Sequence, residues 1–422
     1  MSGDRRRRRA ALLAAGALLA LVALAVVSTL LTGSGNGPGS GSPNPATTSS
    51  ATSGTPTSTP STAATGSAPS PAAQRQGLPA PAGQVFGVSV NRLFNDFSYA
   101  PAQIDAQLAA VRATGATIAR SDALWEATEP RAPVDGRHSY DWAFDDEIAR
   151  SLAAHDLAWL PIIDYTAPWD QSIPGQDHSP PLSDAGYADY AAAFAARYGP
   201  GGSFWAANPG LRPEPVTTIE IWNEPDSPEF WLPSPDPAAY AGLYLAARAA
   251  IDRVVPTIRV IVGGLTDPAR FLPAMVSARP LLRAHVDGVA IHPYGSPAVV
   301  IARVRAARAA LVSLGMASVP LYVTEFGWTT SPPGAPDYAA PTVRNGYIVR
   351  TLAALGHLRC GLAASLLYTW VTPEADPRDA QDWYGIADPV ATAPTASTEA
   401  FAAGLAAAGG PEPAAAPAPC PS

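Results

Sequence analysis

Between residues 84 and 408, short apolar runs rich in β-branched residues alternate with longer stretches in which Ala, Leu and Val recur at spacings of three and four. The short runs have the composition of buried strands, and the longer stretches have the period of helices that bury one face. Strands and helices that alternate in this way form a parallel sheet covered by helices. The pattern therefore predicts a domain of the α/β class.

The pattern contains enough strands to close a barrel. Eight strand segments are expected, at residues 85–90, 116–119, 158–163, 216–222, 258–263, 286–291, 321–325 and 363–370. Helical segments include residues 101–113, 184–197, 238–254, 297–314 and 342–355. Eight such units in about 325 residues predict a (β/α)8 TIM barrel with long loops. An open doubly wound sheet is the rival fold, but the first strand leads into Asn91-Arg92-Leu93-Phe94 and not into the glycine-rich turn of that fold.

The first 32 residues have a different pattern. Five arginines at residues 5–9 precede an apolar run over residues 10–32 that carries no charge. This run is long enough to span a bilayer, and the positive-inside rule would keep the arginines in the cytoplasm. We expect residues 1–32 to form a basic segment and a transmembrane signal anchor, with the domain that follows lying outside the cell. A cleaved signal peptide and a secreted protein are the alternative, because Ala-Leu-Ala at residues 23–25 is similar to a cleavage site.

Two further segments lack the composition of a packed domain. Residues 33–83 are almost wholly Gly, Ser, Thr, Pro and Ala, and residues 409–422 are rich in Pro and Ala. Such segments bury too little apolar surface to offset the entropy lost on ordering. We predict a disordered linker, then the barrel domain over residues 84–408, then a disordered tail.

Charge and cysteine content narrow the range of partners. The chain has 27 basic and 35 acidic residues, a formal net charge of −8 and no lysine, which argues against nucleic acid as a partner. Cys360 and Cys420 are the only cysteines and have no metal-site spacing. One disulfide between them is favoured in an oxidising compartment, because the last strand and the last helix would bring both to the bottom of a barrel. Two unpaired cysteines are the alternative.

Two of the predicted strands end in a glutamate. The fourth strand belongs to the sequence TIEIWNEP at residues 218–225, and the seventh to LYVTEFGW at residues 321–328. Their last glutamates are Glu224 and Glu325, and the C-terminal strand ends of a parallel barrel are where catalytic residues lie. A single glutamate there is usually a capping or surface residue, so the hypothesis rests on the pair. Two carboxyl groups in one cleft can serve as the acid/base and the nucleophile of retaining glycoside hydrolysis.

These motifs resemble those of the cellulase-like retaining glycoside hydrolases of clan A, with families 39 and 5 nearest. The resemblance covers about residues 84–408 and implies that Glu224 is the acid/base and Glu325 the nucleophile. It also implies substrate-binding or supporting positions, namely Arg120, Asn223, His292, Tyr294 and Trp370. The third strand ends in DYTAPW at residues 164–169, without the histidine usual in family 5, and this favours family 39.

The implied roles follow from the chemistry. Arg120, if it faces Glu325, would keep that carboxylate ionised, and the negative charge would raise the pKa of Glu224. Asn223 would bind the sugar 2-hydroxyl, and Tyr294 would hold the nucleophile in line. His292 is expected to support the site rather than transfer a proton. The structural alternative for Arg120 is a surface ion pair with Asp122 or Glu126.

Aromatic side chains are expected at the same face of the barrel. Six tryptophans fall in or beside the predicted βα loops, namely Trp125, Trp169, Trp231, Trp328, Trp370 and Trp383. Of these, Trp169, Trp328 and Trp370 are the candidates for stacking against sugar rings, with barrel core as the alternative for Trp370. Trp205 should lie at the bottom of the barrel, and Trp142 and Trp159 should pack in the core.

We therefore expect a monomeric glycosidase that cleaves β-linked polysaccharide or oligosaccharide without a cofactor or metal. Its partners would be the carbohydrate and, through the N-terminal helix, a membrane. A transglycosylase that uses the same covalent intermediate and a non-catalytic carbohydrate-binding barrel are the alternatives. A metal-dependent barrel hydrolase is disfavoured because no His-x-His motif ends the first strand.

Overall fold

The computed structural model describes residues 83–95, 99–411 and 420 of the chain. The predicted membrane segment, all of the linker but residue 83, and most of the tail lie outside the described residues. Among the helices of the described ranges, none combines the length and the apolar composition needed to cross a membrane.

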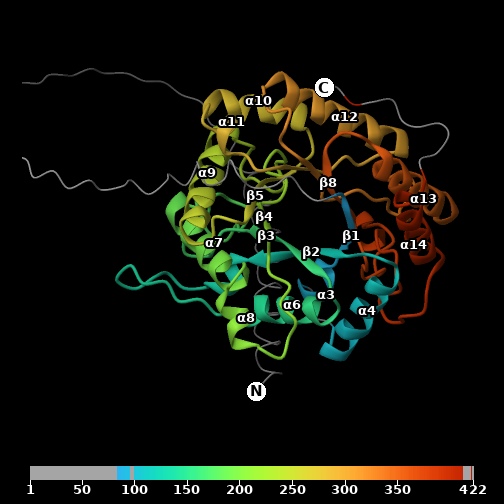
Figure 1. The fold of residues 1–422 in the computed structure, drawn as a ribbon, viewed down its shortest axis with the longest axis horizontal. Helices are drawn as coiled ribbons and strands as arrows, with labels where there is room; N and C mark the ends of the chain where they lie inside the picture. The colour runs from blue at the N-terminus through green and yellow to red at the C-terminus, as the bar shows by residue number, and fades with distance from the viewer. Residues whose placement is uncertain (1–82, 96–98, 412–419, 421–422) are drawn as a thin grey trace, which may run out of the picture. The chain divides into compact units, whose positions relative to one another are not determined.

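Eight parallel strands close into a barrel in which each strand pairs with its neighbours in sequence and β8 pairs with β1. The strands are β1 (Val85–Ser89), β2 (Ile118–Leu124), β3 (Ala158–Asp164), β4 (Thr218–Ile221), β5 (Arg259–Leu265), β6 (Val289–Ile291), β7 (Leu321–Val323) and β8 (Leu362–Leu367). Figure 1 looks into this barrel and shows the helices arranged around the strands. This architecture is the predicted (β/α)8 barrel.

The helices fill the connections between successive strands. They are α3 (Asn91–Asn95), α4 (Pro101–Ala113), α5 (Trp125–Thr128), α6 (Ala143–Ala154), α7 (Asp184–Tyr198), α8 (Ser203–Ala207), α9 (Pro237–Val254), α10 (Pro268–Ala278), α11 (Leu282–His285), α12 (Pro297–Ser313), α13 (Pro341–His357), the 3-10 helix η2 (Ala380–Trp383) and α14 (Ala396–Ala408). Several of these helices begin with a proline in the first turn. A backbone N–H there has no hydrogen-bond partner within the helix, so the lack of an N–H in proline costs no hydrogen bond.

The interior of the barrel changes from apolar to polar along its axis. Its apolar layer includes Leu160, Ile261, Tyr322 and Leu366. Towards the C-terminal strand ends, Asp122 of β2 pairs with Ile162 of β3, which pairs with Glu220 of β4. Because alternate residues of a strand face the same side, Arg120 lies on the face of Asp122, one step closer to the apolar layer. The register therefore gathers charged side chains inside the upper end of the barrel.

The predicted C-terminal end of β2 was wrong, and the reason is this polar content. We expected a strand over residues 116–119, but β2 continues to Leu124. Arg120, Ser121 and Asp122 interrupt the apolar run and made the strand look finished, yet all three are buried. Polar residues in the middle of a buried strand signal a site inside the barrel.

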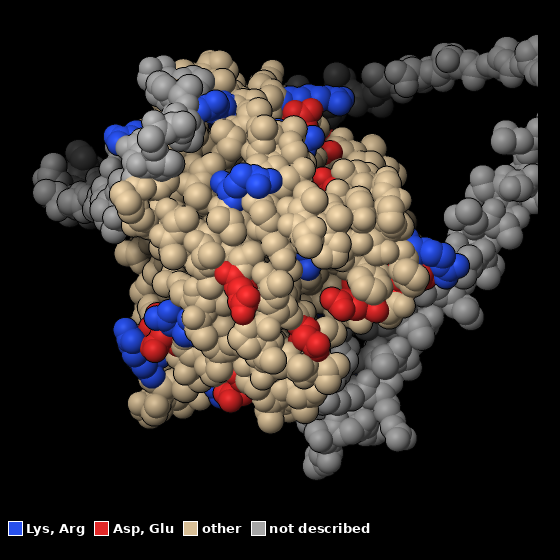
Figure 2. Space-filling model, turned by 90° about the vertical axis from the view of Figure 1, so that its right-hand side faces the viewer, with Lys and Arg blue, Asp and Glu red and all other residues tan. Residues whose placement is uncertain are grey.

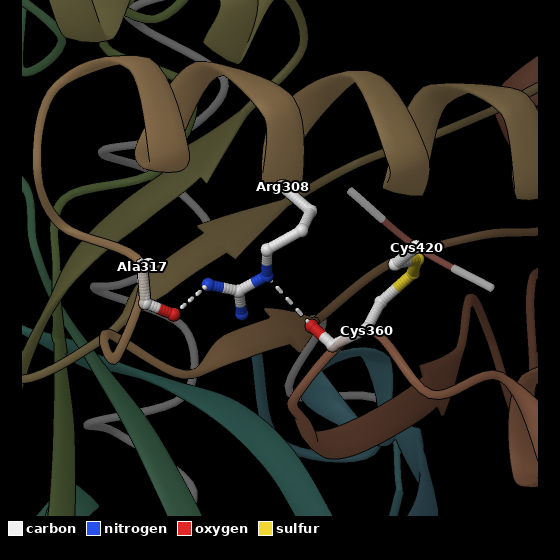
Figure 3. Close-up of a disulfide and its surroundings, with 4 residues drawn as sticks. All are labelled: Arg308, Ala317, Cys360 and Cys420. Carbon is white, nitrogen blue, oxygen red and sulfur yellow. Dashed lines mark hydrogen bonds between the residues drawn. A yellow bond between two sulfur atoms is a disulfide. The ribbon is translucent and has the colours of Figure 1, made fainter. Parts of the chain in front are cut away.

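A disulfide joins Cys420 to the other end of the barrel. Cys360, which precedes β8, is bonded to Cys420, with 5.2 Å between their Cα atoms. Figure 3 shows Arg308 of α12 beside this bond, donating from Nε to the Cys360 carbonyl at 2.9 Å and from Nη1 to the Ala317 carbonyl at 2.8 Å. The link thus lies at the N-terminal ends of the strands, away from the polar upper end.

Candidate active site

The two glutamates lie just beyond the strands that the sequence assigned to them. β4 ends at Ile221 and β7 at Val323, so Glu224 and Glu325 both lie in the loops at the C-terminal strand ends. Trp222 and Glu224 have positive φ angles of 66° and 44°. This conformation costs a side-chain-bearing residue about 1–2 kcal/mol, and such strain gathers at functional sites.

Glu325 is held by two donors. Arg120 Nη1 forms a salt bridge to Oε1 of Glu325, and the Tyr294 hydroxyl donates to Oε2 at 2.6 Å. Burial alone would raise the pKa of Glu325, but the positive charges of His292 and Arg120 and the Tyr294 hydrogen bond outweigh it. The pKa of Glu325 is consequently lowered, and its carboxyl group is ionised.

Arg120 is itself fixed by a second, fully buried carboxylate. Its Nε donates to Glu220 Oε2 at 2.8 Å, and its Nη2 donates to Asn223 Oδ1 at 3.0 Å. Glu220 also accepts the Gly264 N–H at 2.8 Å and the Thr324 hydroxyl at 3.3 Å. The surface ion pair that we considered for Arg120 is excluded, because its side chain is 2% exposed.

Sequence reasoning missed Glu220, although a signal for it existed. The residue interrupts an apolar run, TIEI, at a position that alternation places inside a parallel barrel. A carboxylate is almost never fully buried without a partner. The pattern alone therefore indicated a buried ion pair, but it did not indicate which cation was the partner.

Glu224 contacts His292. Its Oε1 lies 2.7 Å from Nδ1 of His292, whose Nε2 lies 3.0 Å from the Thr324 hydroxyl. Burial raises the pKa of Glu224, the charge of Glu325 adds to this effect, and His292 opposes it. Burial would lower the pKa of His292, but Glu325 and Glu224 outweigh it, so the pKa is raised.

The hydrogen bonds around His292 define where its protons lie. The Thr324 hydroxyl donates to Glu220, so it accepts from His292, and Nε2 carries a proton. The hydrogen bond between His292 Nδ1 and Glu224 Oε1 then needs one further proton, which is carried either by Nδ1 or by the carboxyl group. Gly264 makes room for this imidazole, because a Cβ there would lie 1.9 Å from His292 Nε2.

The two carboxyl groups are close together. One ligand atom each from Glu224, His292 and Glu325 lies within 4.8 Å of the other two. Of the residues that the structure describes, these three could share a metal ion. Arg120 already neutralises part of their negative charge, which weakens the case for a divalent cation.

Six predicted site residues are thus gathered in one place, namely Arg120, Asn223, Glu224, His292, Tyr294 and Glu325. The predicted tryptophan platforms are not. Trp370 is 1% exposed, and its indole N–H donates to the side-chain oxygen of Gln107 in α4 at 2.8 Å. Trp328 is 2% exposed, and its indole N–H donates to the Gly295 carbonyl at 2.8 Å. Rings so deeply buried have no free face for a sugar, so the platform role expected for Trp370 and Trp328 was wrong.

The other tryptophans also pack mainly against protein. Trp125 and Trp231 are buried, as are Trp205 and Trp159. Trp169 is partly exposed, but its ring meets Trp125 edge-on at 5.4 Å and its N–H donates to the Glu129 carbonyl. A sugar contact for Trp169 stays a prediction.

Comparison with known proteins finds likeness in fold but not in sequence. No protein-family model matches the chain, and no curated protein matches it. A family 39 glycoside hydrolase from the gut symbiont Bacteroides cellulosilyticus WH2 superposes with a TM-score of 0.55 at 20% identity, covering 76% of this chain and 63% of that chain. The chain thus spans less than two thirds of that protein.

Two other solved structures are similar to a comparable degree. A monomeric beta-xylosidase from Caulobacter crescentus CB15 has a TM-score of 0.58 at 23% identity and covers 77% of this chain and 69% of that chain. A fungal beta-1,4-galactanase has a TM-score of 0.52 at 16% identity, over 76% of this chain and 99% of that chain. At these identities the likeness shows the fold alone, which is a (β/α)8 barrel.

Proposed function

We propose that the protein is a retaining glycoside hydrolase that cleaves β-linked polysaccharide or oligosaccharide. The observation that carries this proposal is the spacing of Glu224 and Glu325, whose ligand oxygens lie within 4.8 Å of each other at the mouth of the barrel. Retaining enzymes separate their carboxyl groups by about 5–5.5 Å, whereas inverting enzymes need about 6.5–9.5 Å to admit a water. The short spacing supports double displacement.

The ionisation of the two groups supports the same assignment. Glu325, with a lowered pKa, is the ionised nucleophile that attacks the anomeric carbon. Glu224, with a raised pKa, is the acid that protonates the leaving oxygen. Opposite shifts in two neighbouring carboxyl groups are how a single site obtains one acid and one base.

The second half of the reaction follows from the loss of one charge. When Glu325 becomes a glycosyl ester, the negative charge that raised the pKa of Glu224 disappears. Glu224 then releases its proton more readily and acts as the base that activates water. His292 is positioned to hold this carboxylate, because its Nδ1 contacts Glu224 at 2.7 Å.

Asn223 and Tyr294 orient the reacting groups. Arg120 binds the Asn223 carbonyl oxygen, which leaves the amide N–H groups as the side available to donate to a sugar 2-hydroxyl. Tyr294 donates to Glu325 and keeps its carboxylate from rotating. The hydrogen bond to the sugar 2-hydroxyl strengthens as the oxocarbenium-like transition state forms.

The test begins with a screen of purified protein against a panel of β-linked polysaccharides and oligosaccharides. Proton NMR of the first product released should show the anomer of the substrate. Initial release of the opposite anomer would overturn the retaining mechanism. The same assay with added acceptor sugars separates hydrolysis from transglycosylation, because a transglycosylase gives longer products.

We further propose that the catalytic domain is exported and remains anchored to the membrane. The apolar run at residues 10–32 supports an anchor, and the bond between Cys360 and Cys420 supports an oxidising compartment. On the face shown in Figure 2 the basic side chains are scattered and several lie beside acidic ones, without a continuous basic patch for nucleic acid. Cell fractionation should recover the full chain with membranes, whereas a mature chain in the medium that starts near residues 26–34 would indicate a cleaved signal peptide.

A further inference from the structure

Three aromatic side chains pack against one another in the loops after β3 and β4. The ring centres of Tyr165 and His178 are 4.3 Å apart, and those of His178 and Phe230 are 5.1 Å apart. Tyr165 and Phe230 are 6.3 Å apart with their planes inclined by 17°. All three residues are partly exposed, unlike Trp328 and Trp370. We call this group, Tyr165, His178 and Phe230, the aromatic wall.

The aromatic wall begins at the catalytic centre. Tyr165 directly follows β3, and its hydroxyl lies near enough to Asn223 and Glu224 that both affect the pKa of Tyr165. Its ring meets Trp222 edge-on at 5.2 Å. Phe230 belongs to the loop after β4, the same loop that carries Glu224. The wall therefore extends outward from the acid/base, on the β3 and β4 side of the mouth, whereas Glu325 lies after β7.

Hydrogen bonds between the two loops hold the wall in place. The Leu232 N–H donates to the His178 carbonyl at 3.1 Å, and His178 Nδ1 donates to the Glu229 carbonyl at 2.8 Å. The Trp222 indole donates to the Phe230 carbonyl at 2.6 Å. Rings held in this way lose little further freedom on binding, which favours a preformed binding surface.

We propose that the aromatic wall is the leaving-group subsite, which stacks the departing pyranose unit, the sugar whose oxygen Glu224 protonates as its bond to the anomeric carbon breaks. This inference rests on the proposed function, because the acid that protonates the leaving oxygen must lie on the side of the departing sugar. Flat rings with one free face suit the C–H face of a pyranose, which is apolar while its edge is polar. The same surface would bind an acceptor sugar in the reverse direction.

The test compares two substrates that differ only in the leaving group. One is a β-linked oligosaccharide that the protein cleaves, and the other is the glycosyl fluoride of the same glycone, whose leaving group has no ring to stack. Phe230→Leu keeps an apolar side chain but removes the flat ring. It should lower kcat/KM for the oligosaccharide about threefold to tenfold and leave the fluoride within about twofold. Phe230→Tyr, which keeps a ring, should retain most of the activity on both.

A matched control lies outside the wall. Tyr347 of α13 is also partly exposed and meets Trp328 edge-on, so Tyr347→Leu removes a comparable ring without touching the proposed subsite. It should leave the ratio of the two kcat/KM values unchanged. Equal losses on both substrates in Phe230→Leu, or no loss on either, would overturn the subsite.

Failure of the proposed function has a different signature. If the wild-type protein cleaves neither substrate, the glycosidase proposal fails, and the wall is then tested by titration with the same β-linked oligosaccharides. Weaker binding by Phe230→Leu than by Phe230→Tyr supports the wall as a sugar-binding surface. Equal affinity of the two variants overturns it.

Discussion

Arg120 and Glu220 form an ion pair inside the barrel, with 2.8 Å between Nε and Oε2 and with both side chains almost completely buried. The same guanidinium also contacts Glu325. One arginine is thus shared between a structural carboxylate and the proposed nucleophile. Because Glu220 neutralises part of the positive charge, it limits how far Arg120 can lower the pKa of Glu325.

Glu220→Gln should move the acidic limb of the pH profile to lower pH. The amide keeps the shape and part of the hydrogen bonding, but it removes a negative charge, so the full charge of Arg120 acts on Glu325 and its pKa falls further. The profile of kcat/KM against pH measures this shift. An acidic limb that moves to higher pH would contradict the charge-sharing arrangement.

The same substitution should reduce stability. Removing one partner of a buried ion pair leaves an incompletely compensated charge, which typically costs about 3–5 kcal/mol. Urea denaturation of Glu220→Gln beside the wild type measures the loss. Arg212→Gln serves as the control, since its ion pair with Asp156 is exposed and its removal should cost less than about 1 kcal/mol.

His292→Asn should shift the whole pH profile upward. His292 lowers the pKa of both Glu224 and Glu325, so its loss should raise both values and move both limbs of the bell to higher pH. A purely structural role would lower kcat while leaving the limbs in place. The pH dependence of kcat/KM therefore separates an electrostatic contribution from simple packing.

Cys420→Ser should destabilise the barrel without changing its chemistry. The disulfide closes a loop with a sequence separation of 60, for which chain entropy predicts a loss of about 4 kcal/mol when the link is removed. The link lies at the N-terminal ends of the strands, so kcat/KM at low temperature should match the wild type. Denaturation curves with and without reductant provide the check, because a reductant should destabilise the wild type and leave the variant unchanged.

The strand order and the two glutamates could be predicted because both are local in sequence. An apolar β-branched run that stops at a glutamate defines a strand end, and closure of eight parallel strands brings the strand ends together. The contact of Arg120 with Glu325, 205 residues away, was expected only through the family resemblance, and its contact with Glu220, 100 residues away, was not predicted at all. The strand register of the closed barrel decides which of the charged side chains that face its interior contact one another.

The tryptophan platforms show where sequence reasoning stops. Position in a βα loop places a residue near the mouth of the barrel, but it does not tell which way its ring points. Trp370 lies beyond the end of β8, where strand alternation no longer applies, and its indole turns outward to Gln107 of α4. The partly exposed ring of Phe230 had no motif that distinguished it from a packing residue, and the DYTAPW string that contains Tyr165 was used only to choose between families.

The roles of Glu224 and Glu325 can be distinguished by adding azide to variants of each and determining the configuration of the glycosyl azide that forms. Glu224→Ala should nearly abolish hydrolysis of a sugar-linked substrate but still form the glycosyl ester from an activated aryl glycoside, whose leaving group needs little protonation. Azide should then restore turnover and give a glycosyl azide of retained configuration, because it attacks the ester without a general base.

Glu325→Gly should give the opposite stereochemistry. The variant has lost its nucleophile and the space that the carboxylate filled, so azide can enter there and attack the anomeric carbon directly. The product of this single displacement is the inverted glycosyl azide, which proton NMR distinguishes from the retained one through the coupling at the anomeric position. If the two variants exchange their products, the roles are reversed, and if neither loses activity, Glu224 and Glu325 are not the catalytic pair.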